Sequence, residues 1–334
     1  MLKKEGKLRL RGGMTKKVRE ERVKKLTAVG RARKAMQGLV TPGMAADTPA
    51  VRAKMAAKFP QRSIPVRITQ GFLPPAAGVE VGDFIKAVGT FDSSAGAGPT
   101  GLRPQFVKEL VGAGADDPCV QAMFDVSALF IEGRVPRFLR RWYAGGNLVG
   151  IGKDDKPLEE DARPIVVGEF WRRVSGKMSL FSDKDELSGW LKPGQVAVGV
   201  EAGCEVIVHS LRQWFERNQD NTRYILFKKD FSNAFNEAGP DAFLNTACRR
   251  TPGSARLAEW CYGEESYLIY NGEVFRSEAG VHKSSRGQQG CPLMVPLFCA
   301  MKREMRGAIP EVGGLDFAAD FADDGVDGGD FEEV

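Results

Sequence analysis

Histidine is nearly absent from this chain of 334 residues, which contains only His209 and His282. Its six cysteines are scattered, and no two of them form a C-x-x-C pair. These two scarcities argue against a zinc site and against a catalytic triad built on histidine. We expect most of the cysteines to be reduced core residues of an intracellular protein, and any catalysis to depend on carboxylates.

Long hydrophobic runs are also missing. A membrane-spanning helix needs about 18 or more consecutive apolar residues, whereas the longest candidate, residues 292–301, has ten residues and two prolines. No apolar run follows the basic start of the sequence, so it does not resemble a secretory signal. We therefore expect no membrane partner, and the hydrophobic fraction of 43% is that of a globular protein.

Charge is distributed unevenly along the chain. Lys and Arg far outnumber Asp and Glu in residues 1–70, whereas residues 315–334 hold eight acidic side chains and no basic one. A basic arm indicates a polyanionic partner such as nucleic acid. The alternative is a solvated, partly disordered extension, and composition leaves both interpretations open.

The order of predicted elements indicates a mixed fold. Residues 14–55 are rich in Lys, Arg and Ala and are expected to be a fraying helix or disordered, and the Gly- and Pro-rich residues 71–101 are expected to be a linker or entry loop. From about residue 102 the density of apolar residues becomes that of a folded domain. Helices and strands then follow without a regular βαβ order, so we predict the α+β class.

Four local signals carry this prediction. Residues 203–218 place apolar side chains at helical spacing, and a second helix is expected over residues 293–306. Residues 223–229 are typical of a strand. Residues 267–276 predict a hairpin, because the Asn-Gly dipeptide at their centre tolerates the positive φ of a type I′ turn.

Two adjacent carboxylates, Asp323 and Asp324, stand between Ala322 and Gly325. Taken alone, such a pair most often marks a solvated turn. The pair could take part in metal binding if a third carboxylate lay close to it. Asp230, which follows the predicted strand, stands 93 residues before Asp323. A strand-end aspartate and an Asp-Asp turn can converge on two Mg²⁺ ions roughly 3.5–4 Å apart, an arrangement that serves in-line phosphoryl displacement.

Three segments in this order, FKKDFSNAF (227–235), RGQQGCPL (286–293) and DFADDGV (320–326), resemble motifs A, B and C of the reverse transcriptase palm. Their amino-acid sequences are similar to those of the same motifs in non-LTR, LINE-type retrotransposons. Two upstream segments agree: AGAGPTGLRP (95–104) resembles the segment before the fingers, and ARPIVVGEFWRRVSGK (162–177) resembles a fingers segment.

The resemblance implies a role for each matching position. Asp230 and Asp323 would be the main metal ligands, with Asp324 beside them and the Phe231 carbonyl as a further donor; the metal would be two Mg²⁺ ions, with Mn²⁺ as a substitute. Phe235 would lie against the sugar of the incoming nucleotide and exclude a 2′-hydroxyl, which favours dNTPs. The other substrate-binding positions implied are Ala234, Gln289, Gly290, Arg163, Lys153 and Lys156.

Several of these positions have a plainer structural interpretation when taken singly. Phe235 alone would more often be a core side chain, Gln289-Gly290 a simple turn and Arg163 a surface residue. Either Lys153 or Lys156 could be the lysine that joins Arg163 on the triphosphate.

For the whole chain the resemblance implies an α+β fingers–palm of the reverse transcriptase type over residues 76–334, after a basic, partly helical or disordered extension over residues 1–75. We expect the domain to lack the thumb of a reverse transcriptase. Only ten residues follow Asp324, and they are acidic and Gly-rich where an apolar second strand is expected. Residues 282–287 look like an insertion before motif B.

The implied function is RNA-directed DNA synthesis for a retrotransposon, with an RNA template, a DNA primer and dNTPs as partners. The expected location is intracellular, in the nucleus. The alternative is a catalytically dead nucleic-acid-binding remnant of a retroelement, which would keep the fold without the chemistry.

Overall fold

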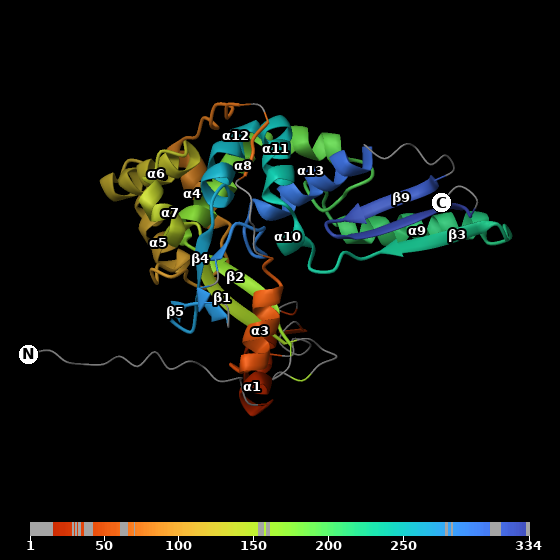
Figure 1. The fold of residues 1–334 in the computed structure, drawn as a ribbon, viewed down its shortest axis with the longest axis horizontal. Helices are drawn as coiled ribbons and strands as arrows, with labels where there is room; N and C mark the ends of the chain where they lie inside the picture. The colour runs from red at the N-terminus through yellow and green to blue at the C-terminus, as the bar shows by residue number, and fades with distance from the viewer. Residues whose placement is uncertain are drawn as a thin grey trace, which may run out of the picture.

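The computed structural model of the protein describes residues 16–28, 30, 32, 35–36, 43–60, 66–69, 71–152, 157, 161–277, 280–281, 283–307 and 315–331. Helices and strands are mixed, in agreement with the expected α+β class. Most helices gather on the left of Figure 1, one sheet lies below them, and a second sheet extends to the right. Lys153, Lys156 and His282 lie outside the described residues.

The described helices agree with the two that the sequence predicted over residues 203–218 and 293–306, which are α9 and α13. Helix α1 falls within the segment expected to be partly helical. In chain order the helices are α1 (Lys16–Ala28), α3 (Pro49–Ala57), α4 (Val81–Gly89), α5 (Pro104–Leu110) with the 3₁₀ turn η1 (Val111–Ala113), α6 (Pro118–Ile131), α7 (Arg137–Tyr143), α8 (Phe170–Leu191), α9 (Gly203–Asn218), α10 (Ala234–Glu237), α11 (Pro240–Arg250), α12 (Pro252–Tyr262) and α13 (Met294–Gly307).

The largest hydrophobic core surrounds α8, against which α4, α6, α12 and α13 pack. Phe170, Val174 and Met178 follow one another at intervals of four residues along α8, and all three are fully buried. Because residues four apart lie on one face of a helix, this face is the centre of the helical layer.

Part of the segment expected to be a linker is helical. Helix α4 begins at a capping box formed by Glu80 and Asp83, and it buries Phe84 and Val88 on one face. The linker prediction was therefore wrong for these residues. The glycines and prolines that flank α4 on both sides dominate the composition of residues 71–101 and hide a short amphipathic pattern.

The first sheet has the order β2-β1-β4-β5, with β8 paired to β4. Its strands are β1 (Gly146–Ile151), β2 (Arg163–Gly168), β4 (Ser266–Tyr270), β5 (Glu273–Val274) and β8 (Lys283–Ser284), and the short strands β6 (Arg276–Ser277) and β7 (Gly280–Val281) pair separately. The predicted hairpin is confirmed. Asn271 and Gly272, between β4 and β5, have φ values of 53° and 85°.

Helix α3 contributes to the core of this first sheet. Val51 and Met55 on α3 and Phe59 just after it are fully buried, in one cluster with Leu148 of β1 and Leu268 of β4. A stretch of the Lys- and Arg-rich N-terminal segment is therefore a packed element of the fold.

The second sheet is antiparallel and has the order β3-β10-β9, from β3 (Tyr224–Lys229), β9 (Leu315–Phe321) and β10 (Asp324–Asp330). It confirms the predicted strand over residues 223–229, and β9 and β10 form a hairpin around the Asp-Asp pair. Helix α9 covers one face, where Trp214 stacks on Tyr224 with ring centroids 5.8 Å apart and also contacts Phe317.

The composition of β10 differs from the apolar strand that was expected, yet β10 is the central strand of this sheet. The close neighbours of two of its glycines explain why larger apolar side chains are not found at these positions. A Cβ on Gly325 would overlap Asp320 Oδ1, and one on Gly328 would lie 2.9 Å from the Trp214 ring. Glycine is needed in β10 because side chains of neighbouring elements occupy the space above and below it.

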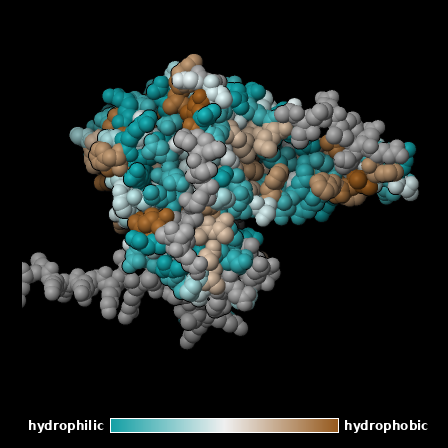
Figure 2. Space-filling model, in the orientation of Figure 1, coloured by the Kyte–Doolittle hydropathy of each residue, from teal (hydrophilic) through white to brown (hydrophobic). Residues whose placement is uncertain are grey.

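The face drawn in Figure 2 is mostly hydrophilic, with hydrophobic residues in small scattered groups. None of the helices in the described ranges is both long enough and apolar enough to cross a membrane. All six cysteines are free, and four of them, Cys248, Cys261, Cys291 and Cys299, are buried as expected.

Helix α13 is tied to α11 by a carboxylate that accepts several hydrogen bonds. Glu304 accepts from Thr246 at 2.6 Å, from Arg249 at 2.5 Å and from Arg250 at 3.2 Å. Burial opposes ionisation of Glu304, but these hydrogen bonds outweigh it and lower the pKa to about 2 from its ordinary 4.5.

We predict that Glu304→Gln lowers the free energy of unfolding by about 1–2 kcal/mol at pH 7, after allowance for solvent screening. A carboxyl with a depressed folded-state pKa stabilises the fold above its unfolded pKa, and this contribution is lost as the pH falls toward the folded value. The difference between wild type and Glu304→Gln should therefore shrink between pH 5 and pH 2, as measured by urea unfolding. Glu216→Gln on the exposed side of α9 is the control; a constant difference across this range would contradict the prediction.

Candidate functional site

The three aspartates predicted to bind metal come to the same end of the second sheet. Strand β3 ends at Lys229, which pairs with Gly325, so Asp230 directly follows the last paired residue of β3 and Asp324 directly precedes its partner in β10. Asp323 lies in the two-residue loop that joins β9 to β10. Asp230 and Asp324 are exposed and Asp323 is half-buried.

These carboxylates are not gathered into a ready-made metal cage. Among the described residues, no group of three or more Asp, Glu, His or Cys side chains is placed to hold a metal ion. Their chemistry nevertheless fits Mg²⁺, which prefers hard oxygen ligands and is usually bound by one or two carboxylates together with water and substrate phosphates. The exposure of Asp230 and Asp324 leaves this end of the sheet open to both.

A residue with left-handed backbone stands beside the carboxylates on each side of the site. Asn233, three residues after Asp230, has a φ of 56°, and Ala322, just before Asp323, has a φ of 55°. Asparagine tolerates this conformation, whereas for alanine it is unfavourable and persists where the surroundings impose it. Asn233 Nδ2 donates to the Lys58 carbonyl at 2.9 Å, so the segment after α3 supports the loop that carries Asp230.

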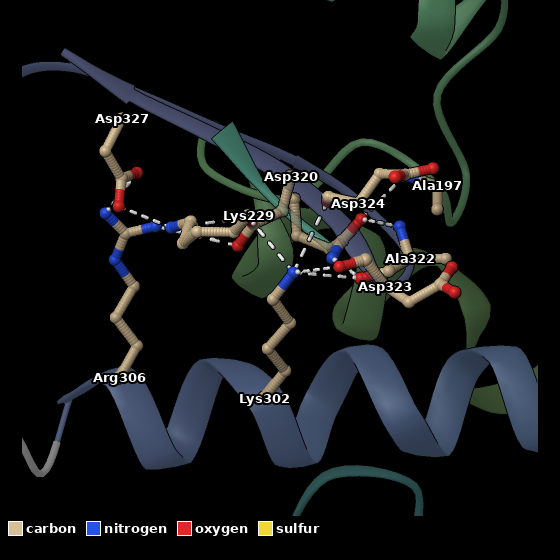
Figure 3. Close-up of polar contacts among 10 residues, drawn as sticks. Ala197, Lys229, Lys302, Arg306, Asp320, Ala322, Asp323, Asp324 and Asp327 are labelled. Atoms are coloured by element: carbon tan, nitrogen blue, oxygen red, sulfur yellow. Dashed lines mark hydrogen bonds and ion pairs between the residues drawn. The ribbon is translucent and has the colours of Figure 1, made fainter. Parts of the chain in front are cut away.

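Beneath the aspartates lies a network of charged side chains that the sequence did not predict (Figure 3). Lys302 Nζ lies 3.1 Å and Lys229 Nζ 3.8 Å from Asp320 Oδ1. Arg306 lies 3.6 Å from Asp320 Oδ2 and 2.8 Å from Asp327 Oδ1. Lys229 also pairs with Asp327.

In this network three cations, from Lys229, Lys302 and Arg306, face two carboxylates, which leaves one surplus positive charge. Charges withdrawn from water are tolerated only when they are paired, and these are. The surplus lies under the end of the sheet that carries the three aspartates, so it partly balances their mutual repulsion. No local pattern could have identified this network, because its members come from β3, β9, β10 and α13.

The aromatic residues after Asp230 pack on α13. The ring of Phe235 meets Phe298 edge-on at 5.1 Å between centroids, and that of Phe231 meets Phe298 at 6.4 Å. Phe235 is half-buried and Phe231 is 46% exposed, whereas Ala234 is buried at the start of α10. Phe235 thus contributes to core packing and keeps part of its surface accessible.

Gln289 and Gly290 are joined to the first sheet. Both are exposed, and the Gln289 carbonyl accepts a hydrogen bond of 3.0 Å from the Val166 amide in β2. Gly290 has a φ of 106°, and a Cβ there would lie 2.7 Å from the Val166 carbonyl oxygen. The position therefore requires glycine on two grounds, backbone conformation and close approach.

A buried guanidinium anchors this loop from inside, and the sequence did not reveal it either. Arg172 of α8 is 1% exposed and donates to Gln288 Oε1 at 2.5 Å and to the Ala144 carbonyl. Its side chain also lies over the ring of Tyr262 at 4.8 Å. The loop that carries Gln289 is thus fixed to both α8 and β2.

Of the three cations expected to contact a triphosphate, Arg163 alone falls within the described residues. It is exposed and is the first residue of β2, three positions before the Val166 that bonds Gln289. Arg163 therefore lies on the same strand to which the Gln289-Gly290 loop is hydrogen-bonded. Lys153 and Lys156 lie outside the part of the chain that is described.

A scan against protein-family models finds no family that matches this chain, and a search of curated proteins finds no matching relative.

Substitution of Gly290 tests the contact between the Gln289-Gly290 loop and β2. We predict that Gly290→Ala lowers the free energy of unfolding by about 1–3 kcal/mol, because alanine is strained at positive φ and its Cβ approaches the Val166 carbonyl. Gly189→Ala is the control: Gly189 lies in α8 with nothing near its Cβ position, so alanine there should stabilise by about 0.5–1 kcal/mol. Urea unfolding measures both, and equal effects of the two substitutions would contradict the prediction.

Proposed function

We propose that the protein is an RNA-directed DNA polymerase of a non-LTR retrotransposon, which adds dNTPs to a DNA primer on an RNA template. The observation that carries the proposal is the register of the second sheet: Lys229, the residue before Asp230, pairs with Gly325, the residue after Asp324, and Asp323 lies in the adjoining loop. Three carboxylates from two distant sequence motifs at one exposed sheet end suit the two-metal chemistry of nucleotidyl transfer.

In this proposal Asp230, Asp323 and Asp324, with the Phe231 carbonyl, hold two Mg²⁺ ions, and Mn²⁺ can replace them. The bound metal supplies Lewis-acid stabilisation of the charge that develops on the phosphate oxygens. The residues themselves orient the ions and position the substrate. The ion-paired network around Asp320 keeps the strands that carry them in register.

The remaining substrate contacts in the proposal are those that the sequence resemblance implies. Phe235 and Ala234 border the sugar, Gln289 and Gly290 line the nucleotide and template-base pocket, and Arg163 with Lys153 or Lys156 binds the triphosphate. The second sheet with α9 and α13 is the palm in this proposal, and the first sheet with its helices belongs to the fingers. The place of action is intracellular, in the nucleus.

A nucleic-acid-binding remnant without activity is the second candidate. It is favoured by one observation, that the described acidic residues form no ready-made metal group. The two candidates differ in whether a template and a dNTP can draw the three carboxylates into a catalytic arrangement.

Primer extension on a poly-rA/oligo-dT hybrid with dTTP and Mg²⁺ or Mn²⁺ separates these candidates. We expect wild-type protein to extend the primer, and Asp230→Ala and Asp323→Asn to reduce the rate by at least about 1,000-fold, since each removes a metal ligand. Hybrid binding by the variants should remain within a few-fold of wild type. Asp316→Asn, an exposed position at the far end of β9, is the control and should keep wild-type activity.

The result that identifies a remnant is wild-type protein that binds the hybrid but does not extend it with either metal. Extension that persists at the wild-type rate in Asp323→Asn would rule out the metal assignment.

Phe235 is expected to set the choice between deoxyribose and ribose. We predict that Phe235→Val raises the incorporation of NTPs relative to dNTPs by at least about tenfold, because the smaller side chain makes room for a 2′-hydroxyl. Phe298→Leu is the matched control, since it disturbs the same ring contact from the side of α13. If both substitutions shift the sugar preference equally, Phe235 acts through packing and does not contact the sugar.

A further inference from the structure

The turn between β9 and β10 is held from two sides by side chains that are not part of it. We infer that these two, Gln195 and Lys302, are positioning residues that fix the backbone from which Asp323 and Asp324 project. The inference rests on the proposed function, because it concerns the same metal site. Both residues act through the backbone of the turn, so neither is a catalytic residue.

Gln195 satisfies both backbone polar groups of Ala322 with one amide. Its Oε1 accepts from the Ala322 amide at 2.9 Å and from the Ala197 amide at 3.1 Å, and its Nε2 donates to the Ala322 carbonyl at 3.2 Å. The side chain is buried, with 3% of the residue exposed. Two backbone hydrogen bonds between Asp320 and the residues on either side of Gln195, of 2.7 and 2.9 Å, keep the two segments in register.

Lys302 holds the same turn from below, as Figure 3 shows. Its ammonium lies 3.1 Å from the carbonyl oxygens of Ala322 and Asp323, 3.4 Å from that of Asp324, and 3.1 Å from Asp320 Oδ1. An ammonium has three N–H donors, and the three carbonyl oxygens accept hydrogen bonds from it while Asp320 forms an ion pair with it. The residue is buried to 9% exposure, and withdrawal from water is tolerable only because every donor is directed at an oxygen.

The position of Lys302 couples the turn to the loop that carries Asp230. Lys302 lies one helical turn after Phe298 on α13, and its ammonium stands 5.1 Å from the centre of the Phe231 ring. Phe298 in turn contacts Phe231 and Phe235. One face of α13 therefore supports both segments that supply carboxylates to the site.

The conformation that these contacts impose is one that alanine does not adopt readily. Ala322 has a φ of 55°, and five of the contacts described above end on its backbone or on the next two carbonyls. Without them the turn is free to relax to an ordinary conformation, which would move both carboxylates. Residues that orient metal ligands in this indirect way typically change metal affinity by about 10–100-fold when they are replaced.

Two physical effects of Lys302 act in opposite directions, and this makes the inference testable. As a positive charge near a cation site, Lys302 weakens metal binding, so its removal would strengthen binding if charge were its main effect. As a positioning residue, it strengthens metal binding, so its removal weakens binding. Gln195 carries no charge, and its replacement reports position alone.

The experiment measures Mn²⁺ affinity of the full chain by electron paramagnetic resonance, without nucleic acid or dNTP. The variants are Lys302→Met and Gln195→Met, which keep the approximate volume of each side chain. Lys228→Met is the matched control, because Lys228 is an exposed lysine of β3 that takes part in none of the described bonds to the turn and in none of the ion pairs of the network. Asp323→Asn identifies the site, and thermal melting confirms that each variant is folded; if Lys302→Met does not fold, Gln195→Met decides.

We expect both Lys302→Met and Gln195→Met to weaken Mn²⁺ binding by about tenfold or more, and Lys228→Met to leave it unchanged or stronger. Folded Lys302→Met or Gln195→Met protein with wild-type or tighter binding overturns the inference, as does wild-type protein in which Mn²⁺ binding does not depend on Asp323. If Mn²⁺ binding depends on Asp323 but no primer is extended, the proposed function fails, and the comparison of the variants still decides whether these are positioning residues.

Discussion

The insertion of β10 between β3 and β9 is the constraint on which the candidate site depends. Asp230 is the residue after β3, and Asp324 begins β10, so the two come together only if β10 pairs with β3 in the observed register. A slip of one residue would turn every side chain of β10 to the opposite face and separate Asp327 from Arg306 and Lys229. The paired charges thus fix the register that the site requires.

The composition of β10 makes its ordering costly in free energy, and contacts with neighbouring elements offset this cost. A strand rich in aspartate and glycine buries little apolar surface of its own, and glycine loses more conformational freedom on folding than any other residue. The side chains of other elements supply what β10 lacks. Trp214 packs over Gly328, and Asp320 fills the space next to Gly325, where it meets Lys302 and Lys229. Removing any one of these charges would leave its partner buried and less well paired, which is more costly than removing the whole network.

Helix α13 connects these features to the rest of the molecule. Phe298 supports the loop after Asp230, Lys302 and Arg306 reach the second sheet, and Glu304 is bonded to α11. The positions 298, 302 and 306 recur every four residues and so form one face, whereas Glu304 lies on another. The position of α13 therefore determines both the packing of the aromatic residues and the charge balance beneath the aspartates.

Local chemistry is what the sequence by itself determined. The helices α9 and α13, the strand before Asp230 and the Asn271-Gly272 hairpin depend on side-chain periodicity and turn conformation, which neighbouring residues specify. The candidate carboxylates could be proposed because they stand in short motifs whose order resembles a known family. Helix α4 was missed because the glycines and prolines around it masked a short amphipathic pattern.

Only the tertiary structure decided how these pieces meet. The central place of β10, the pairing of Lys229, Lys302 and Arg306 with Asp320 and Asp327, and the contact of Arg172 with Gln288 join residues from 14 to 116 positions apart. Such contacts leave no local pattern, since their stability comes from burial and pairing that exist only after the chain has folded. The sequence could therefore indicate which carboxylates to consider, whereas what holds their backbone in place became visible only in the folded protein.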